Sequence, residues 1–464
     1  MGHDPQDRGR HGADPQHLVQ VSRDHALIQA NGPAPPPGRV PAQGVQMGTA
    51  ASCSAGRPGS ALSVDAARLR AVAVATPVAG AETLHLDQAA GRVLAAPVLA
   101  VLALPPFDNS AMDGYAIRLS DLTGDGPWHL PVSARIAAGD GRRLILPQGS
   151  AARIFTGAPI PLEADAVVIQ EQVSRVGDSV TLTQRPRAGQ NIRRQGEDMA
   201  HGAPALDAGV ALSPPRLALL AGSGVAEVAV RPKVRVAILS TGNELAEPGR
   251  ALGPGQIYNS NRVLLRATLA GLSWVALSDL GILPDDPACI RAAIRDAAQG
   301  HDVVISSGGV SAGEEDHILD ALRAEAAELD VLKVAIRPGK PLTVGRLGAA
   351  LYVGLPGNPY AAAITFSQIA QPALRRVAGL LEEPDNWLPA IAGFRYRRST
   401  GRREYVPVVW TERDPMGRPI LDRLGPGASA ALSPMARAMG IAVIPPDVDA
   451  VHPGMPLPVM LLCP

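Results

Sequence analysis

Short polar residues gather on one stiff stretch of the sequence, LPPFDNSAMDGYAI, residues 104–117. Two prolines restrict the backbone ahead of Asp108, Asn109 and Ser110, and Asp113 follows just before an apolar, strand-like exit. Ordinary scaffold rarely combines so many short polar side chains with a segment stiff enough to aim them. These polar groups are therefore candidates for a site that binds or transforms a ligand.

Three strand-length apolar runs further along the chain each end in polar or Gly-rich sequence. They are followed by STGNEL at 240–245, SSGGVSAGEED at 306–316 and GLPGNP at 354–359. In open parallel sheets, ligands bind beyond the carboxyl ends of the strands. The three strand ends are therefore predicted to converge on one ligand site.

The Gly-rich segment suits a phosphate. Gly308, Gly309 and Gly313 allow backbone N–H groups to approach an anion closely where a helix begins, although such a loop also forms a simple turn. The spacing matches neither a Walker A motif nor GxGxxG. The carboxylates of residues 314–316 would repel a phosphate unless a divalent cation lay between them, and this pattern favours Mg²⁺.

Cationic side chains cluster in DVLKVAIRPGKPLTVG, which holds Lys333, Arg337 and Lys340. The alternation also fits a solvated strand face. A Pro-Gly pair inside the segment favours a rigid turn, which would hold the cations at a fixed spot suited to an oxyanion or phosphate. In LPDDP, at residues 283–287, either Asp285 or Asp286 could simply cap the helix that follows.

The elements that must position these residues follow from periodicity. Residues 1–60 are rich in Gly, Pro and Ala and are predicted to be a disordered leader. A helix is expected over 63–78 and a second helix leading into a strand over 86–100, and residues 105–186 are rich in strands and turns. Residues 233–383 alternate strands and helices, which predicts a mostly parallel sheet covered on both faces. Residues 384–464 favour a small β-barrel or sandwich.

Composition narrows the class of protein. The chain has 43 basic and 43 acidic residues, which argues against a general nucleic-acid binder. No apolar run approaches the roughly 18 residues of a membrane helix. Cys53, Cys289 and Cys463 are far apart in sequence, which favours a reducing cytoplasm over a disulfide framework. The histidine spacing does not suggest structural zinc.

Eight motifs occur in a characteristic order: NSAMDGYA, TGAPIP, GEDM, STGNEL, DDP, GGVSAGEED, RPGKP and GLPGNP. On these motifs, residues 61–464 resemble the molybdopterin molybdenumtransferase family, the molybdenum insertases that include the C-terminal domain of gephyrin. The chain departs from the family pattern in having Asn243 where STGDEL is usual and Arg337 where KPGKP is usual. The C-terminal segment PGASAALSP departs from the family's GS motif.

The resemblance implies an α/β multidomain fold. It comprises an elongated mixed α/β domain that dimerises, a β-rich inserted domain, a mostly parallel α/β domain of the molybdopterin-binding type and a C-terminal small β-barrel. The expected boundaries are 61–104 with 187–232, then 105–186, 233–383 and 384–464. It also implies a homodimer, with a site between the α/β domain of one subunit and the smaller domains of the other.

The implied reaction inserts molybdate into adenylylated molybdopterin and releases AMP, with Mg²⁺ assisting. The adenylyltransferase that makes this substrate is a candidate partner, whereas nucleic acid and membrane are not. The adenylylation step itself is one rival function, although its α/β domain acts without the β domains seen here. A non-catalytic scaffold, as in gephyrin's clustering of receptors, is the other rival.

The resemblance also carries site residues over to this sequence. The expected catalytic residues are Asp113, Thr156, Asp198, Glu244 and Asp316, and the expected metal ligands are Asp285, Asp316 and Glu244. The expected substrate-binding residues are Ser307, Gly308, Gly309, Ser311, Gly313, Lys333, Arg337, Lys340, Pro356, Gly357, Asn358, Pro359, Arg403 and Ser429.

Overall fold

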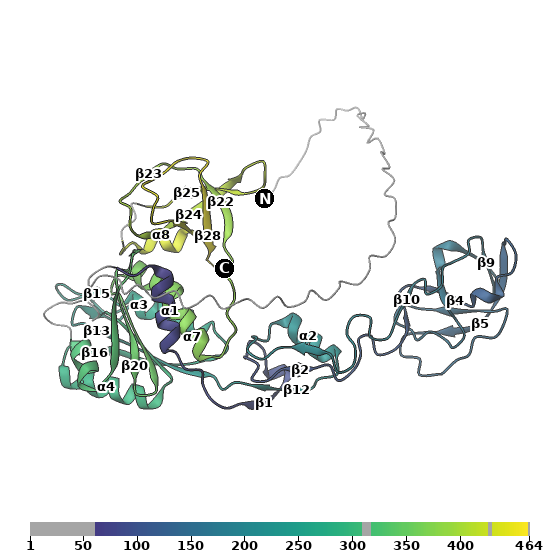
Figure 1. Ribbon diagram of the computed structural model, residues 1–464, viewed down its shortest axis with the longest axis horizontal. Helices are drawn as coiled ribbons and strands as arrows, with labels where there is room; N and C mark the ends of the chain where they lie inside the picture. The colour runs from purple at the N-terminus through teal and green to yellow at the C-terminus, as the bar shows by residue number, and fades with distance from the viewer. Residues whose placement is uncertain (1–60, 309–316, 426–428, 463–464) are drawn as a thin grey trace, which may run out of the picture. The chain divides into compact units, whose positions relative to one another are not determined.

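The computed structural model describes residues 61–308, 317–425 and 429–462 (Figure 1). Its α/β domain is built on a six-stranded sheet in which the first four strands are parallel, the fifth runs antiparallel to them, and the sixth pairs antiparallel with the fifth. The strand order is β16 (Val275–Leu283), β13 (Val234–Thr241), β17 (Val303–Ser307), β21 (Ala350–Leu355), β20 (Pro341–Leu347) and β18 (Glu328–Lys333).

Helices cover both faces of this sheet, as the alternation of strands and helices predicts. Along β13, Val236 and Ile238 pack into one core, whereas Ala237 and Leu239 pack into the other, because successive strand side chains point to opposite faces. The first core includes α3 (Ser260–Ala270), α6 (Pro359–Thr365), η4 (Phe366–Ala370) and α7 (Gln371–Val377), and the second includes α4 (Pro287–Gly300) and α5 (His317–Ala324).

An N-terminal helix completes the first face. In α1 (Val64–Val74), Ser63 caps the helix by accepting a hydrogen bond of 3.1 Å from the backbone N–H of Ala66. The buried Ala67 and Ala71 pack in the core of the α/β domain, and α1 lies beside α7 (Figure 1). This helix therefore packs in the core of the α/β domain, although the boundaries expected from the sequence group residues 61–104 with the mixed domain. The helical periodicity predicted the helix but not the sheet that it covers.

The β-rich inserted domain contains a second six-stranded sheet, with a separate buried cluster on each face. Its strands come from the region that the sequence marked as rich in strands and turns. The order is β7 (Ala166–Ile169), β4 (Gly114–Ile117), β6 (Ala151–Ile154), β5 (Trp128–Ile136), β9 (Ser179–Leu182) and β8 (Val173–Val176).

The C-terminal strands form a closed barrel, because the sheet order ends on β26 and β26 also pairs with β24. The barrel strands are β22 (Leu388–Ala392), β24 (Arg403–Arg413), β25 (Pro419–Arg423), β26 (Gly440–Ile444) and β28 (Pro456–Leu461). A short strand from the α/β region, β19 (Ile336–Arg337), adds to the barrel by pairing in parallel with β24. Of the two architectures that the sequence left open, the barrel is the one formed.

The mixed region pairs β1 (Glu82–His85) with β12 (Glu227–Val230) and β2 (Val98–Leu99) with β11 (Pro204–Leu206), beside α2 (Pro214–Gly222). Over 86–100 the sequence predicted a helix leading into a strand; the helix is wrong, whereas the strand forms as β2. Only the 3₁₀ turn η1 (Leu86–Gln88) forms, Gly91 adopts a φ of +70°, and the chain then extends so that Val93 and Leu94 enter different cores. Tertiary packing thus overrides the local spacing.

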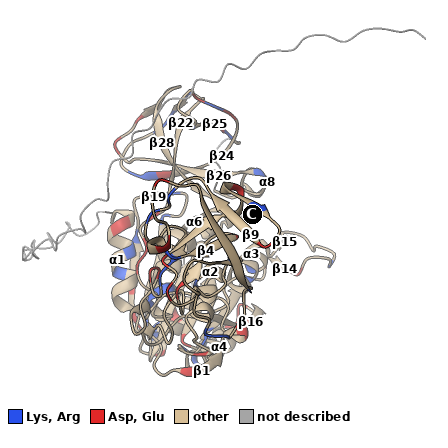
Figure 2. Cartoon of the chain, turned by 90° about the vertical axis from the view of Figure 1, so that its right-hand side faces the viewer, with Lys and Arg blue, Asp and Glu red and all other residues tan. Residues whose placement is uncertain are grey.

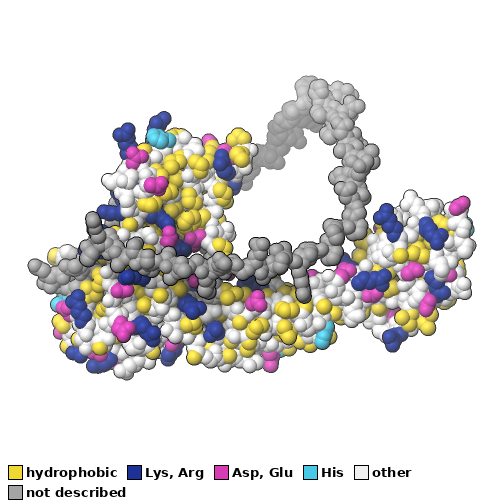
Figure 3. All heavy atoms as spheres, in the orientation of Figure 1, with side chains coloured by type: hydrophobic (Ala, Val, Ile, Leu, Met, Phe, Trp, Pro, Cys, Tyr) yellow, Lys and Arg dark blue, Asp and Glu magenta, His cyan; other side chains and the backbone are white. Residues whose placement is uncertain are grey.

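The remaining elements are short: β3 (Asn109–Ser110), η2 (Leu119–Asp121), η3 (Gln170–Gln172), β10 (Ile192–Arg193), β14 (Leu245–Ala246), β15 (Ile257–Tyr258), β23 (Tyr396–Arg397), α8 (Leu432–Arg437) and β27 (Ala450–Val451). Within the described ranges, no helix combines the length and apolar character needed to cross a bilayer. Basic and acidic side chains are interspersed on the described surface in Figure 3, in keeping with the balanced charge of the sequence.

Candidate active site

The carboxyl ends of three neighbouring strands open into one cavity of about 1070 Å³. Thr241 ends β13, Ser307 ends β17 and Pro356 follows β21, and all three residues line the cavity. The convergence predicted from the sequence is therefore present in the fold. The predicted residues that line this cavity are Glu244, Ser307, Gly308, Arg337, Lys340, Pro356, Gly357, Asn358, Pro359 and Ser429.

The first turn of α3 ties two of these strand ends together. The buried side chain of Asn261 donates through Nδ2 to Ser307 Oγ and to the carbonyl oxygen of Gly357, both at 2.7 Å. Asn259 caps the helix by accepting from the backbone N–H of Arg262 at 3.0 Å. Both asparagines line the cavity and were missed by sequence reasoning. The YNSN sequence ahead of an apolar helix was the signal that could have identified them.

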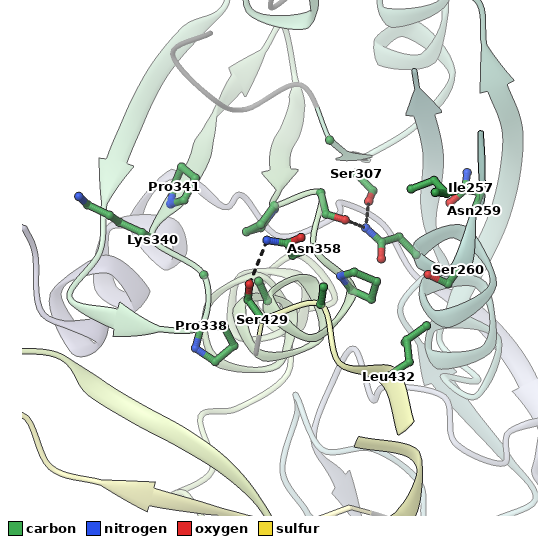
Figure 4. Close-up of a pocket in the computed structure, with 18 of the residues that line it drawn as sticks. Ile257, Asn259, Ser260, Ser307, Pro338, Lys340, Pro341, Asn358, Ser429 and Leu432 are labelled. Atoms are coloured by element: carbon green, nitrogen blue, oxygen red, sulfur yellow. Dashed lines mark hydrogen bonds between the residues drawn. The ribbon is translucent and has the colours of Figure 1, made fainter. Parts of the chain in front are cut away.

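Asparagine also links the α/β domain to the barrel across the cavity. Asn358 donates through Nδ2 to Ser429 Oγ at 3.0 Å, and Figure 4 shows the two side chains pointing toward each other. Ala430 and Leu432 extend the barrel's contribution to the lining. Ser429, which the resemblance carried over despite the altered motif, thus reaches the cavity.

The predicted cations separate into two groups. Arg337 and Lys340 line the cavity, whereas Lys333 is exposed at the end of β18 and does not. At the barrel, Arg402 lines the cavity and its neighbour Arg403 does not. The cavity therefore has a cationic wall made of Arg337, Lys340 and Arg402, a set suited to an oxyanion or phosphate.

Arg403 has a structural partner instead. Its two terminal nitrogens donate to the two carboxylate oxygens of Asp65 on α1, at 2.9 and 2.7 Å. This hydrogen bond lowers the pKa of Asp65 from its ordinary value of 3.8. Figure 2 shows that α1 carries both acidic and basic residues, and Arg68 of this helix similarly reaches Asp385 and the backbone of Gln368. Arg403 therefore fastens α1 to the barrel.

Two of the predicted metal-ligating carboxylates, Glu244 and Asp285, lie at or next to the cavity. Glu244 lines the cavity, and Asp285 accepts a 2.9 Å hydrogen bond from the backbone N–H of Asn243, next to Glu244 in sequence. Asp286 provides the cap of α4 by accepting from the N–H of Cys289 at 2.7 Å, so the capping interpretation holds for Asp286 and not for Asp285. Among the described residues, no three metal-ligating side chains cluster together.

The polar stretch at residues 104–117 forms a loop held by hydrogen bonds. Asp108 accepts from Arg194 at 2.6 Å, and Asn109 and Ser110 donate to backbone carbonyls within the same loop. Asp113 differs, because its Oδ1 accepts from both the N–H and the hydroxyl of Thr156, at 2.8 and 2.7 Å.

The hydrogen bond from the backbone of Thr156 is the main cause that lowers the pKa of Asp113. This carboxylate is thus held ionised while it remains partly exposed. Asp198 donates its backbone N–H to the carbonyl of Leu104 at 3.0 Å. None of Asp113, Thr156 and Asp198 lines the cavity formed by the α/β domain and the barrel. The other predicted residues, Gly309, Ser311, Gly313 and Asp316, lie outside the described residues.

Three families match consecutive parts of the chain. Residues 62–224 match the MoeA N-terminal region (domain I and II), residues 237–376 match a probable molybdopterin binding domain, and residues 389–462 match the MoeA C-terminal region (domain IV).

Relatives and solved structures agree with these matches. The chain is 42% identical to the molybdopterin molybdenumtransferase of Haemophilus influenzae over 327 residues, which is 70% of this chain and 80% of that protein. It is 40% identical to molybdopterin molybdenumtransferase 2 of Mycobacterium tuberculosis over 81% of this chain and 94% of that one. The molybdopterin biosynthesis moeA protein of Pyrococcus horikoshii is similar in structure, with a TM-score of 0.73, 27% identity and coverage of 87% and 100%. The chain belongs to the molybdopterin molybdenumtransferase family.

Proposed function

We propose that this chain inserts molybdate into adenylylated molybdopterin and releases AMP, which yields the molybdenum cofactor. The observation that carries the proposal is the cationic wall of Arg337, Lys340 and Arg402 at the carboxyl ends of parallel strands, in a cavity large enough for a nucleotide-sized ligand. The printed names of the relatives, molybdopterin molybdenumtransferases at 40–42% identity, support the same activity.

The cavity residues would act by binding and orienting rather than by forming a covalent intermediate. A molybdate oxygen or a water attacks the phosphorus on the molybdopterin side of the phosphoanhydride, the bond from that phosphorus to the bridging oxygen breaks, and AMP leaves with the bridging oxygen and the electron pair of the broken bond. The cationic wall would hold the phosphate and molybdate oxygens through charge-assisted hydrogen bonds. Molybdenum would take its thiolate ligands from the pterin, so no cysteine of the chain is needed.

Mg²⁺ is the cofactor proposed for this step. Glu244 and Asp285 supply the hard oxygen ligands that Mg²⁺ prefers, and two carboxylates together with substrate phosphates match its usual coordination. Asp316 is the third proposed ligand. When bound, the cation would neutralise charge on the phosphate oxygens.

A homodimer would explain why the site residues fall into two groups. Asp113, Thr156 and Asp198 are absent from the lining of the cavity, as a shared site between subunits requires. We place the reaction in the cytoplasm, and the molybdopterin adenylyltransferase is the proposed donor of substrate.

The test uses the purified chain with adenylylated molybdopterin, Mg²⁺ and molybdate, and follows AMP by chromatography. Molybdate-dependent AMP release that stops on chelation with EDTA is expected. Asp316→Asn should abolish release and leave the dimer intact in light scattering. Consumption of ATP without added adenylylated substrate would favour the adenylyltransferase function, and substrate binding without AMP release would favour a scaffold.

Subunit sharing has its own test. Asp113→Asn and Lys340→Ala chains, each inactive alone, should recover activity when they are unfolded, mixed and refolded together. A shared site predicts that each mixed dimer keeps one intact site, so the mixture should regain about a quarter of wild-type activity. No recovery, with mixed dimers demonstrated, would refute the sharing.

A further inference from the structure

We infer that Glu404 is a positioning residue that orients Arg337 toward an oxyanion in the cavity. The inference rests on the proposed function, since it names a residue that prepares the cationic wall. Glu404 is buried in the barrel and does not line the cavity, whereas the Arg337 side chain does and is 43% exposed.

Three groups surround the Glu404 carboxylate. Its Oε1 accepts from the hydroxyl of Tyr396 at 2.8 Å and lies 3.4 Å from Nε of Arg337. Its Oε2 lies 2.9 Å from Nε of the fully buried Arg398. Arg398 is itself fixed by donating to the carbonyl of Pro445 at 2.7 Å. The carboxylate that faces Arg337 is therefore held by the hydroxyl of Tyr396 and by its ion pair with Arg398, and within the described ranges no other acidic side chain pairs with Arg337.

The backbone enforces the same pairing. Arg337 in β19 and Glu404 in β24 are opposite each other in the parallel register that joins the two strands. The neighbouring Gly339 has a φ of +114°, so the turn that follows Arg337 has a conformation that few other residues adopt. The backbone pairing and the side-chain contact thus both place the Arg337 guanidinium group beside Glu404.

The chemistry of this contact distinguishes arginine from lysine. Glu404 engages Nε, and among the described residues neither terminal nitrogen of Arg337 has a partner, so both can bind an oxyanion through two parallel hydrogen bonds. A lysine at this position has one nitrogen, which the buried carboxylate would draw away from the cavity. Arg337, where the family usually has lysine, is therefore matched to Glu404.

The experiment measures direct binding of molybdate to the purified full-length chain by isothermal titration calorimetry, which needs no turnover. Glu404→Gln should weaken binding about tenfold, and Arg337→Lys should weaken it at least as much. The double variant should bind more tightly than Arg337→Lys alone, because the lysine is no longer drawn to the carboxylate. Glu412→Gln, an exposed carboxylate of the same strand, is the matched control and should bind like wild type.

Four binding results would contradict the role of Glu404, the role of Arg337 or the proposed function. Removing a negative charge near an anion site should by itself tighten anion binding, so equal or tighter binding by Glu404→Gln would refute a positioning role. If Glu404→Gln unfolds, the Arg337→Lys variant tests the inference alone, since it leaves Arg398 and Tyr396 paired with Glu404. Wild-type affinity for molybdate in Arg337→Lys would refute the match between Arg337 and Glu404. No molybdate binding by the wild-type chain removes Arg337 as an oxyanion ligand. Molybdate binding without AMP release would refute the proposed function and leave this inference standing.

Discussion

Arg402 and Arg403 are neighbours in sequence, yet the structure gives them different tasks, and alanine substitutions should separate these tasks cleanly. Arg402 lines the cavity, and its side chain has no hydrogen-bond or ion-pair partner among the described residues. Arg403 makes the bidentate contact with Asp65. Arg402→Ala should therefore impair molybdate binding and spare stability, whereas Arg403→Ala should do the reverse.

The magnitudes follow from these contacts. Losing one charge-assisted hydrogen bond to a bound oxyanion costs about 1.5–3 kcal/mol, so Arg402→Ala should weaken molybdate binding by roughly tenfold to a hundredfold. The pair of Arg403 with Asp65 is screened by solvent, because the side chains are 21% and 60% exposed. Its loss should cost about 1 kcal/mol and lower the thermal midpoint by roughly 1–2 °C.

The assay combines the KM for molybdate in AMP release with differential scanning fluorimetry of each variant. Lysine substitutions at both positions serve as charge-conserving controls. The reasoning would be refuted if Arg403→Ala raised the KM tenfold at an unchanged midpoint while Arg402→Ala left the KM at its wild-type value. That result would restore Arg403 as the substrate-binding residue expected from the sequence.

Three further predictions concern stability. The pKa of Asp65 is lowered, so its ion pair stabilises the fold above pH 3.8, and this stabilisation is lost as the pH falls through the lowered pKa. Asp65→Asn should therefore be less stable than wild type near neutral pH, and its stability should depend less on acid. Urea unfolding at several pH values measures both effects. Gly339→Ala would place a Cβ 2.5 Å from Thr365 Cγ2 in a left-handed conformation, and the thermal midpoint should fall by the equivalent of about 1–3 kcal/mol. Asn261→Asp would turn a donor into an acceptor facing the Gly357 carbonyl, which should cost about 2–4 kcal/mol in chemical unfolding and also weaken molybdate binding.

Matched controls accompany these variants. Gly141→Ala adds a methyl group where no atom lies within 4 Å and where φ is not positive, so it should unfold like wild type. Glu412→Asn, at an exposed position, should keep the acid sensitivity that Asp65→Asn loses. An unchanged midpoint in Gly339→Ala, or tight molybdate binding by Asn261→Asp, would contradict the geometry from which these expectations come.

The place of the cavity could be predicted from the sequence because its signals are local. Apolar runs of strand length end at Thr241, Ser307 and Leu355, and the parallel topology brings such ends together. The role of Arg403 could not be predicted, because Arg402 precedes β24 and Arg403 begins it, and only the pairing of β24 with β19 decides which of the two reaches the cavity. Asn261 was equally hidden, since its partners, Ser307 and Gly357, lie 46 and 96 residues away.

The pairing of β19 with β24 also limits how the chain can be divided. Tyr405, Ile441 and Val443 of the barrel belong to the same buried core as Tyr360 of α6, whose hydroxyl donates to the carbonyl of Tyr405 at 2.9 Å. An excised α/β domain that ended before β22 would expose this apolar surface together with an unpaired strand edge, a combination that promotes aggregation. The two parts are thus not interchangeable modules: chimaeras of relatives should fold only when both sides of this joint come from the same parent.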